Sequence, residues 1–268
     1  MLLPLTRTLV FLCLLLFSFN SYSAVNADSS CHNVKPTHEA FEVLLSRYVR
    51  AGQVDYMTWQ KNKTDRQALH GYVRHLAEYC PDDFKSLDKP GQLALLLNLY
   101  NAAVIERVLQ YFPVESITDI RIDSKDAFNV AWIPVSWSTI REMSLNHLEN
   151  ELIRPMFKDT RIHFALVCAA KSCPELLARP YRAETVLNQL RHQTRSFFQN
   201  EEQVSYRQDE NALVVSKIFK WYEKDFVADA GSLQAYLVRE FKRANGVDIP
   251  ADVKVLFHDY SWVLNQSP

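Results

Sequence analysis

Apolar side chains in the first half of the chain recur at the spacing of amphipathic helices. Residues 37–50 and residues 64–79 each carry such a stripe, which predicts two helices with one buried face. Residues 93–105 are instead apolar nearly all round, so the helix that Asp88 is expected to cap should be buried on every side. The pattern therefore predicts a helix-rich N-terminal half around a buried central helix.

Three polar side chains, Asn98, Tyr100 and Asn101, interrupt this apolar stretch. A buried amide without a hydrogen-bond partner costs about 1–3 kcal/mol, so each of them needs a partner. Asn98 and Asn101 either join the helix to neighbouring backbone or line a cavity and bind a ligand.

The second half of the chain alternates irregularly between short β-prone and helical stretches. Residues 162–168 are almost continuously apolar, which favours a buried strand. Residues 204–207 and 212–215 predict a hairpin. Further elements are expected as helices at residues 144–153, 184–199 and 232–244 and strands at residues 130–135, 137–140, 253–257 and 262–264. The prediction is a single α+β domain with a mixed or antiparallel sheet in its C-terminal half.

The amino terminus has the pattern of a cleavable secretory signal. An apolar run at residues 9–19 follows a weakly basic start and precedes small residues, and it is shorter than the roughly 20 residues that span a bilayer. Cleavage after Ala27 fits best and cleavage after Ser23 is the alternative, whereas an uncleaved anchor is the competing interpretation. We expect a signal peptide at residues 1–27, a mature domain at residues 28–268, and a periplasmic or secreted location.

Composition excludes several classes of partner. The chain has 268 residues, of which 48% are hydrophobic and 23% charged, so a sizeable core is expected. A net charge of −1 without a basic cluster argues against nucleic acid, and five glycines are too few for a phosphate-binding scaffold. We expect no cofactor, no membrane span after signal removal, and an unknown small-molecule or peptide ligand.

Four cysteines remain after the predicted signal: Cys31, Cys80, Cys168 and Cys173. An even number in an exported protein favours disulfides. Cys168 and Cys173 are close enough in sequence to pair, and Cys31 could then pair with Cys80. Cys80 could equally be a buried thiol, because it continues the apolar stripe of the second helix.

Several stretches resemble the domain-of-unknown-function 547 family, and the segment CAAKSCP at residues 168–174 is the most specific of them. The others are residues 54–59, 98–102, 144–154, 161–168, 213–222 and 260–262. Members of this family often carry a histidine just after the glutamate matched by Glu149, whereas this chain has Asn150. The resemblance implies no particular activity.

The segment CAAKSCP also carries the sharpest chemical hypothesis. If Pro174 opens a short helix, Cys173 lies at its N-terminus, where the backbone N–H groups and the nearby Lys171 would lower the pKa of the thiol. His163 is then the nearest candidate base, and Glu149, Asn98 or Asn101 could orient it. His147 and His258 are more distant candidates.

Other interpretations of these residues remain open. Cys168 and Cys173 could form a structural disulfide or a redox-active pair, and their spacing with His163 matches no standard zinc pattern, so no metal is expected. The aromatic residues at positions 219, 221, 222 and 226 have helical spacing, which favours core packing over a pocket lining. Two functions follow: a thiol-dependent hydrolase or acyltransferase acting on peptide or amide substrates, or a non-catalytic, disulfide-stabilised binding protein.

Overall fold

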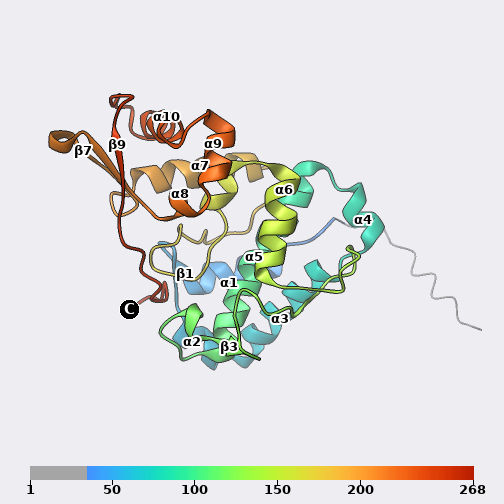
Figure 1. The fold of residues 1–268 in the computed structure, drawn as a ribbon. Helices are drawn as coiled ribbons and strands as arrows, with labels where there is room; N and C mark the ends of the chain where they lie inside the picture. Colours follow the sequence, from blue (N-terminus) through green and yellow to red (C-terminus); the bar gives the residue numbers. More distant parts are fainter. Residues whose placement is uncertain (1–34) are drawn as a thin grey trace, which may run out of the picture. The chain divides into compact units, whose positions relative to one another are not determined.

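The computed structural model describes residues 35–268, all of which belong to one compact unit (Figure 1). The signal peptide predicted for residues 1–27 lies outside the described residues. Helices dominate the first half, as predicted: α1 Glu39–Tyr48, α2 Tyr56–Lys61, α3 Lys63–Ala77, α4 Pro81–Ser86 and α5 Lys89–Tyr111, with a short hairpin of β1 Val49–Arg50 and β2 Gln53–Val54.

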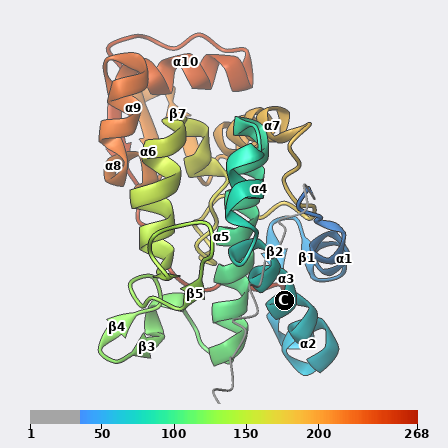
Figure 2. The same ribbon diagram turned by 90° about the vertical axis from the view of Figure 1, so that its right-hand side faces the viewer.

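Helix α5 is the predicted buried helix. Its 23 residues begin after Asp88, whose carboxylate accepts a hydrogen bond of 2.8 Å from the N–H of Gly91. The residues from Gly91 to Ile105 are buried without exception, so the helix has no solvent-exposed face over this stretch. Other helices surround it in two perpendicular views (Figures 1 and 2), and α3 in particular packs along it.

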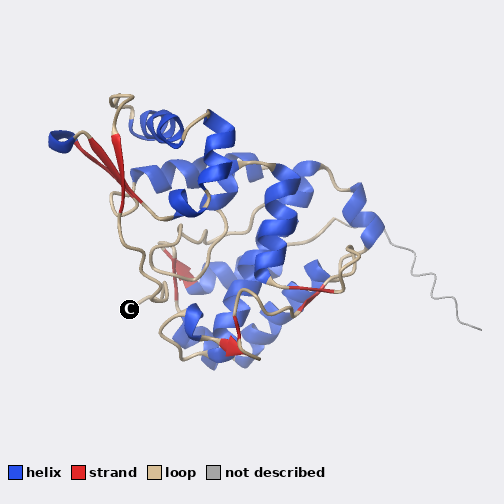
Figure 3. Ribbon diagram, in the orientation of Figure 1, coloured by secondary structure: helices blue, strands red, loops and turns tan. Residues whose placement is uncertain are grey.

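The second half is mixed, which confirms the α+β class (Figure 3). The predicted hairpin forms with the expected bounds, as β7 Val204–Arg207 and β8 Ala212–Val215, and β9 Lys254–Phe257 adds parallel to β8. Small antiparallel pairs precede it: β3 Arg121–Ile122 with β4 Lys125–Asp126, and β5 Ile133–Pro134 with β6 Glu142–Met143. The helices are a π-helix His147–Ile153 that continues into α6 Arg154–Phe157, then α7 Val186–Gln199, α8 Ile218–Trp221, α9 Glu223–Ala230 and α10 Leu233–Asn245, with 3₁₀ turns Ile117–Asp119, Thr160–Phe164 and Gln208–Glu210.

The strand predicted at residues 162–168 is wrong. Its burial is as expected, but Thr160–Phe164 is a 3₁₀ turn that Asp159 caps by accepting a hydrogen bond from the N–H of Arg161. The backbone after this turn pairs with the side chain of Asn101 rather than with a neighbouring strand. The apolar residues thus predicted burial correctly. The conformation instead depends on the cap at Asp159 and on the amide of Asn101, which bonds the backbone.

Three further predictions are also corrected. No helix follows Pro174; instead Leu176 forms an isolated bridge with Gly52. A Cβ atom on Gly52 would lie 2.8 Å from the side chain of Glu175, so this close approach requires a glycine. Residues 137–140 form bends rather than a strand, and residues 262–264 make only isolated bridges.

The chain end ties distant segments together. Ala170 bridges to Leu264, and Ser116 bridges to Val263. A second hydrophobic cluster, centred on Phe164, Phe198 and Phe219, forms under α7, α9 and α10 beside the main core around α5. Among residues 35–268, no helix combines the length and apolarity needed to cross a bilayer.

Candidate functional site

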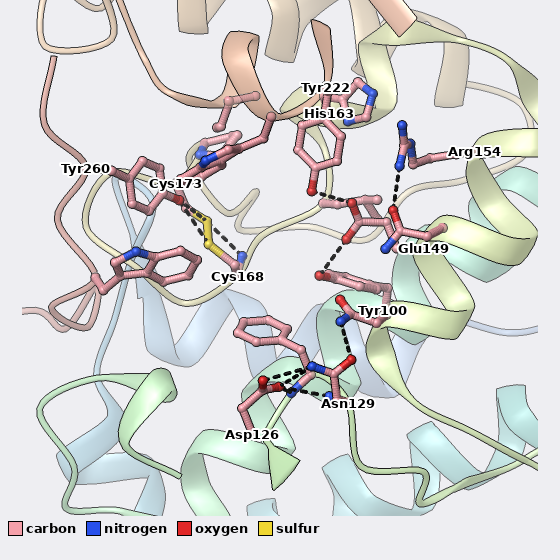
Figure 4. Close-up of a pocket in the computed structure, with 18 residues that line it drawn as sticks. Tyr100, Asp126, Asn129, Glu149, Arg154, His163, Cys168, Cys173, Tyr222 and Tyr260 are labelled. Atoms are coloured by element: carbon pink, nitrogen blue, oxygen red, sulfur yellow. Dashed lines mark hydrogen bonds between the residues drawn. A yellow bond between two sulfur atoms is a disulfide. The ribbon is translucent and has the colours of Figure 1, made fainter. Parts of the chain in front are cut away.

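A pocket of about 400 Å³ lies where the π-helix, the Cys168–Cys173 turn and the chain end meet (Figure 4). We call it the central pocket. Its volume lies within the range of about 300–1,000 Å³ that is typical of small-molecule sites. Its lining residues are Tyr100, Asp126, Phe128, Asn129, Asn146, Glu149, Asn150, Arg154, His163, Leu166, Cys168, Cys173, Pro174, Ile218, Trp221, Tyr222, Tyr260 and Trp262.

Glu149 is the buried carboxylate of the pocket. It lies on the π-helix, a rare conformation that often marks functional sites. The hydroxyl of Tyr100 donates a hydrogen bond of 3.0 Å to one carboxylate oxygen, and the hydroxyl of Tyr222 donates one of 2.5 Å to the other. Burial first, and then the charge of Glu149, raise the pKa of both tyrosines, so both hydroxyls stay protonated as donors.

A second carboxylate, Asp225, orients two residues that line the pocket. His163 Nε2 lies 2.8 Å from Asp225 Oδ2, and Arg154 Nε donates to the same oxygen at 2.9 Å. The hydrogen bond from His163, followed by that from Arg154, holds the pKa of Asp225 well below its ordinary value. The imidazole of His163 is also stacked on Tyr222, with 4.0 Å between ring centroids. His163 is therefore held in one orientation.

Cys168 and Cys173 are joined by a disulfide, one of the pairings that the sequence suggested. The N–H of Cys168 donates to Cys173 Sγ at 2.8 Å, and the Tyr260 hydroxyl lies 3.1 and 3.3 Å from the two sulfurs. Since no helix follows Pro174, the helix dipole expected at Cys173 is absent. Cys80 is disulfide-bonded as well, whereas Cys31 lies outside the described residues.

Three aromatic residues form one side of the pocket, and we call Trp221, Tyr260 and Trp262 the aromatic wall. Their ring centroids lie 4.8–5.8 Å apart, and Trp221 is 47% exposed. The core packing expected from helical spacing holds for Phe219 and Phe226, which are fully buried, but Trp221 and Tyr222 line the pocket. Helical periodicity could not separate them, because the segment bends between α8 and α9.

The two asparagines proposed as ligand-binding residues lie away from this pocket. Asn101 donates to the carbonyl of Ala165 and accepts from the N–H of Val167, both at 2.9 Å. Asn98 makes the same pair of bonds to the backbone of Tyr181, at 2.8 and 2.9 Å. The geometry supports the alternative that they join α5 to neighbouring backbone, because both functional groups of each amide are already used.

The remaining candidates are placed as follows. The side chain of Lys171 is exposed and does not line the central pocket, and neither do His147 and His258. Asn150, where family members often carry a histidine, does line it and accepts a hydrogen bond of 2.6 Å from Arg154. In the part of the chain that the structure describes, no three histidine, cysteine, aspartate or glutamate side chains are grouped to hold a metal ion.

A family described as "Protein of unknown function, DUF547" matches residues 84–198. No curated protein and no solved structure matches the chain. The matched region contains α5, Glu149, His163 and both cysteines of the turn, but not the aromatic wall, so the resemblance expected outside these bounds stays a prediction. Over residues 84–198 the chain resembles the DUF547 family.

Proposed function

We propose that this protein is exported to the bacterial envelope and binds a small carbohydrate in the central pocket. The observation that carries the proposal is the division of the pocket into an aromatic side and a hydrogen-bonding side. In Figure 4, Tyr260 and the disulfide lie on one side, and Glu149 and Arg154 lie on the other.

The aromatic wall suits the apolar face of a sugar ring. A half-exposed tryptophan next to a second tryptophan and a tyrosine leaves apolar surface in water, which favours covering by a ligand. The C–H groups on one face of a pyranose ring can stack on such a surface. A flexible peptide would satisfy the same wall only at a larger cost in conformational entropy.

The opposite side supplies the directional contacts that sugar hydroxyls need. Arg154 has donors and Asn150 and Asn146 have amides at the pocket lining, and Asp126 and Asn129 add further polar atoms at its edge. Arg154 donates hydrogen bonds to Asp225 and to Asn150, and these bonds fix the guanidinium group before a ligand arrives, which lowers the entropy cost of binding.

The test is calorimetric titration of the purified mature protein with N-acetylglucosamine trimer, maltotriose and an unrelated tripeptide. We expect one of the sugars to bind and Trp221→Ala to weaken that binding at least about tenfold, equivalent to about 1.4 kcal/mol. Tyr111→Ala is the matched control, because Tyr111 is an exposed aromatic residue outside the central pocket. Binding of the tripeptide alone, or equal affinities for the two variants, would contradict the proposal.

A thiol-dependent hydrolase or acyltransferase acting on peptide or amide substrates is the second candidate. It is favoured by one observation: both sulfurs line the same pocket as His163 and Glu149. The N–H that bonds Cys173 Sγ could also stabilise a thiolate after reduction. Rapid alkylation of Cys173 by iodoacetamide in protein purified without reductant would support this activity. Peptide mapping that finds Cys168 joined to Cys173 in all molecules would contradict the thiol-dependent activity and favour the binding function.

Export rests on the apolar run at residues 9–19 and has its own test. Mass spectrometry of the protein made in a bacterial host should find a mature terminus at Asp28 or Ala24 in the periplasmic or secreted fraction. A cytosolic protein that retains Met1 would contradict export without affecting the proposed ligand.

A further inference from the structure

A second pocket, of about 810 Å³, lies between α7, α10 and the turn that follows α6. We call it the basic pocket. It shares no lining residue with the central pocket. It is lined by Phe157, Lys158, Asp159, Thr160, Arg161, Arg191, Thr194, Arg195, Asp229, Tyr236, Arg239, Glu240, Arg243 and Ala244.

The charge of this lining differs from that of the chain. Six lining residues are Lys or Arg and three are Asp or Glu, so the lining has a formal charge of 6 − 3 = +3, whereas the whole chain has −1. The cations come from segments that are distant in sequence: the turn after α6, α7 and α10. The fold thus assembles a positive pocket that no run of basic residues in the sequence indicates.

The three carboxylates are already used to hold arginines. Asp159 binds Arg161 through two hydrogen bonds, of 2.9 and 2.6 Å, and Glu240 lies 2.8 Å from Arg239 and 2.7 Å from Arg243. Asp229 pairs with Arg239 as well. These contacts hold three guanidinium groups in place at the pocket.

Three other cations are left for a ligand. Within residues 35–268, Lys158, Arg191 and Arg195 form no ion pair, and Arg191 bonds only the amide oxygen of Asn188. Tyr236, which is almost fully buried, also lines the pocket.

We infer that the basic pocket binds a ligand that carries more than one phosphate group. Guanidinium groups match pairs of phosphate oxygens, and three cations without partners call for more than one negative charge. The volume of this open pocket suits a small diphosphate or a phospholipid headgroup with two phosphates. The inference is independent of the proposed carbohydrate site, since the two pockets have separate linings.

The first experiment titrates the mature protein with inorganic pyrophosphate in a calorimeter at low ionic strength. We expect the double variant Lys158→Gln/Arg195→Gln to weaken binding at least tenfold. The matched control is Lys125→Gln/Arg141→Gln, which removes the same charge from exposed positions outside both pockets. Far-ultraviolet circular dichroism should show that both double variants fold. Binding should weaken as salt is added, because ions screen the pocket.

The second experiment distinguishes a soluble ligand from a lipid. The protein is sedimented with phosphatidylcholine vesicles that contain cardiolipin, whose headgroup carries two phosphates. Binding of pyrophosphate without sedimentation indicates a soluble ligand, and sedimentation that pyrophosphate or the pocket variant abolishes indicates the headgroup. The inference is overturned if neither probe binds, if inorganic phosphate binds as tightly as pyrophosphate, or if the control variant loses as much affinity as the pocket variant.

Discussion

Two sets of side chains meet at the short segment formed by residues 163–168. One set bonds the backbone of the segment, and the other lines the central pocket. Asn101 bonds the backbone of Ala165 and Val167, in the middle of the segment. His163 and Cys168, at its two ends, line the central pocket. From the sequence alone, all three were predicted to be candidate site residues. Asn101 has backbone partners, whereas His163 and Cys168 have side-chain partners, and this difference separates a structural role from a candidate site.

The difference has an energetic basis. An amide that pairs two backbone groups replaces the hydrogen bonds of a missing strand, so removing it leaves a donor and an acceptor without partners. A carboxylate such as Asp225, held by Arg154 and His163 near the surface, is partly compensated by water when one contact is lost. Substitution of a side chain that bonds backbone, such as Asn101, should therefore lower the free energy of unfolding more than substitution of a side chain at the central pocket.

The largest effect is expected for Asn101→Leu. It leaves the carbonyl of Ala165 and the N–H of Val167 without their partner, which should cost about 4 kcal/mol in the free energy of unfolding. Urea denaturation followed by circular dichroism measures this loss. Asn129→Leu, the same change at an exposed position of the central pocket, should cost less than about 1 kcal/mol. Equal losses would remove the distinction between the two sets.

A second effect, at His38 beside the amide of Asn98, depends on pH. Burial, followed by the charge of Arg182, lowers the pKa of His38 from 6.5 to about 4. The hydroxyl of Tyr72 lies 2.7 Å from Nδ1 of this histidine, and the amide of Asn98 lies 3.4 Å from the same atom. As the pH falls, the unfolded chain takes up the proton first, so stability should decrease between about pH 6.5 and pH 4 by about 3 kcal/mol.

The variant His38→Gln should flatten this part of the stability profile. His70→Gln is the control, because His70 is exposed and bonds Glu106 at the surface. Urea denaturation at half-unit steps of pH gives the profile. An unchanged slope in His38→Gln would mean that other groups cause the loss.

The first of these predictions concerns a feature that the sequence indicated well. The all-round apolarity of residues 93–105 predicted the buried helix, and the asparagines within it were expected to bond neighbouring backbone as one of two alternatives. Periodicity also placed the β7–β8 hairpin and α10, which Ser232 caps. Local patterns sufficed here because the positions of the apolar residues within an element determine which of its faces are buried.

Features that depend on contacts between distant segments could not be predicted in this way. A side-chain amide from α5 replaces the strand partner expected for residues 162–168. The aromatic wall combines Trp221 with residues about forty positions later, and the cations of the basic pocket come from α7, α10 and the turn after α6. Glu149, His163 and the two cysteines were named from sequence and do share one pocket, whereas Lys171 does not line it.

A smaller effect is expected for the disulfide of the central pocket. Cys168 and Cys173 enclose a loop of only five positions, so the chain-entropy contribution is limited to about 2 kcal/mol. The double variant Cys168→Ser/Cys173→Ser should lose about this much in urea denaturation. In the variant Cys80→Ser, which lacks the other disulfide-bonded cysteine of the described residues, adding reductant should lower the free energy of unfolding by the same amount. If the double variant loses more free energy of unfolding than Asn101→Leu, the turn has a structural role like that of Asn101.

The smallest effect is expected for Asp225→Asn, which tests whether the pocket side responds in a different pH range. Because bonds from His163 and then Arg154 lower the pKa of Asp225, the ionised form stabilises the fold above about pH 4, and the contribution is lost only as the pH falls further. Since the side chain is 32% exposed, its removal should cost at most about 1 kcal/mol at pH 7. The difference between wild type and variant should stay constant from pH 7 to about pH 4 and narrow below it, whereas the His38 effect develops above pH 4. A difference that already narrows between pH 6.5 and pH 4 would show that the two regions titrate together, and the comparison between them would fail.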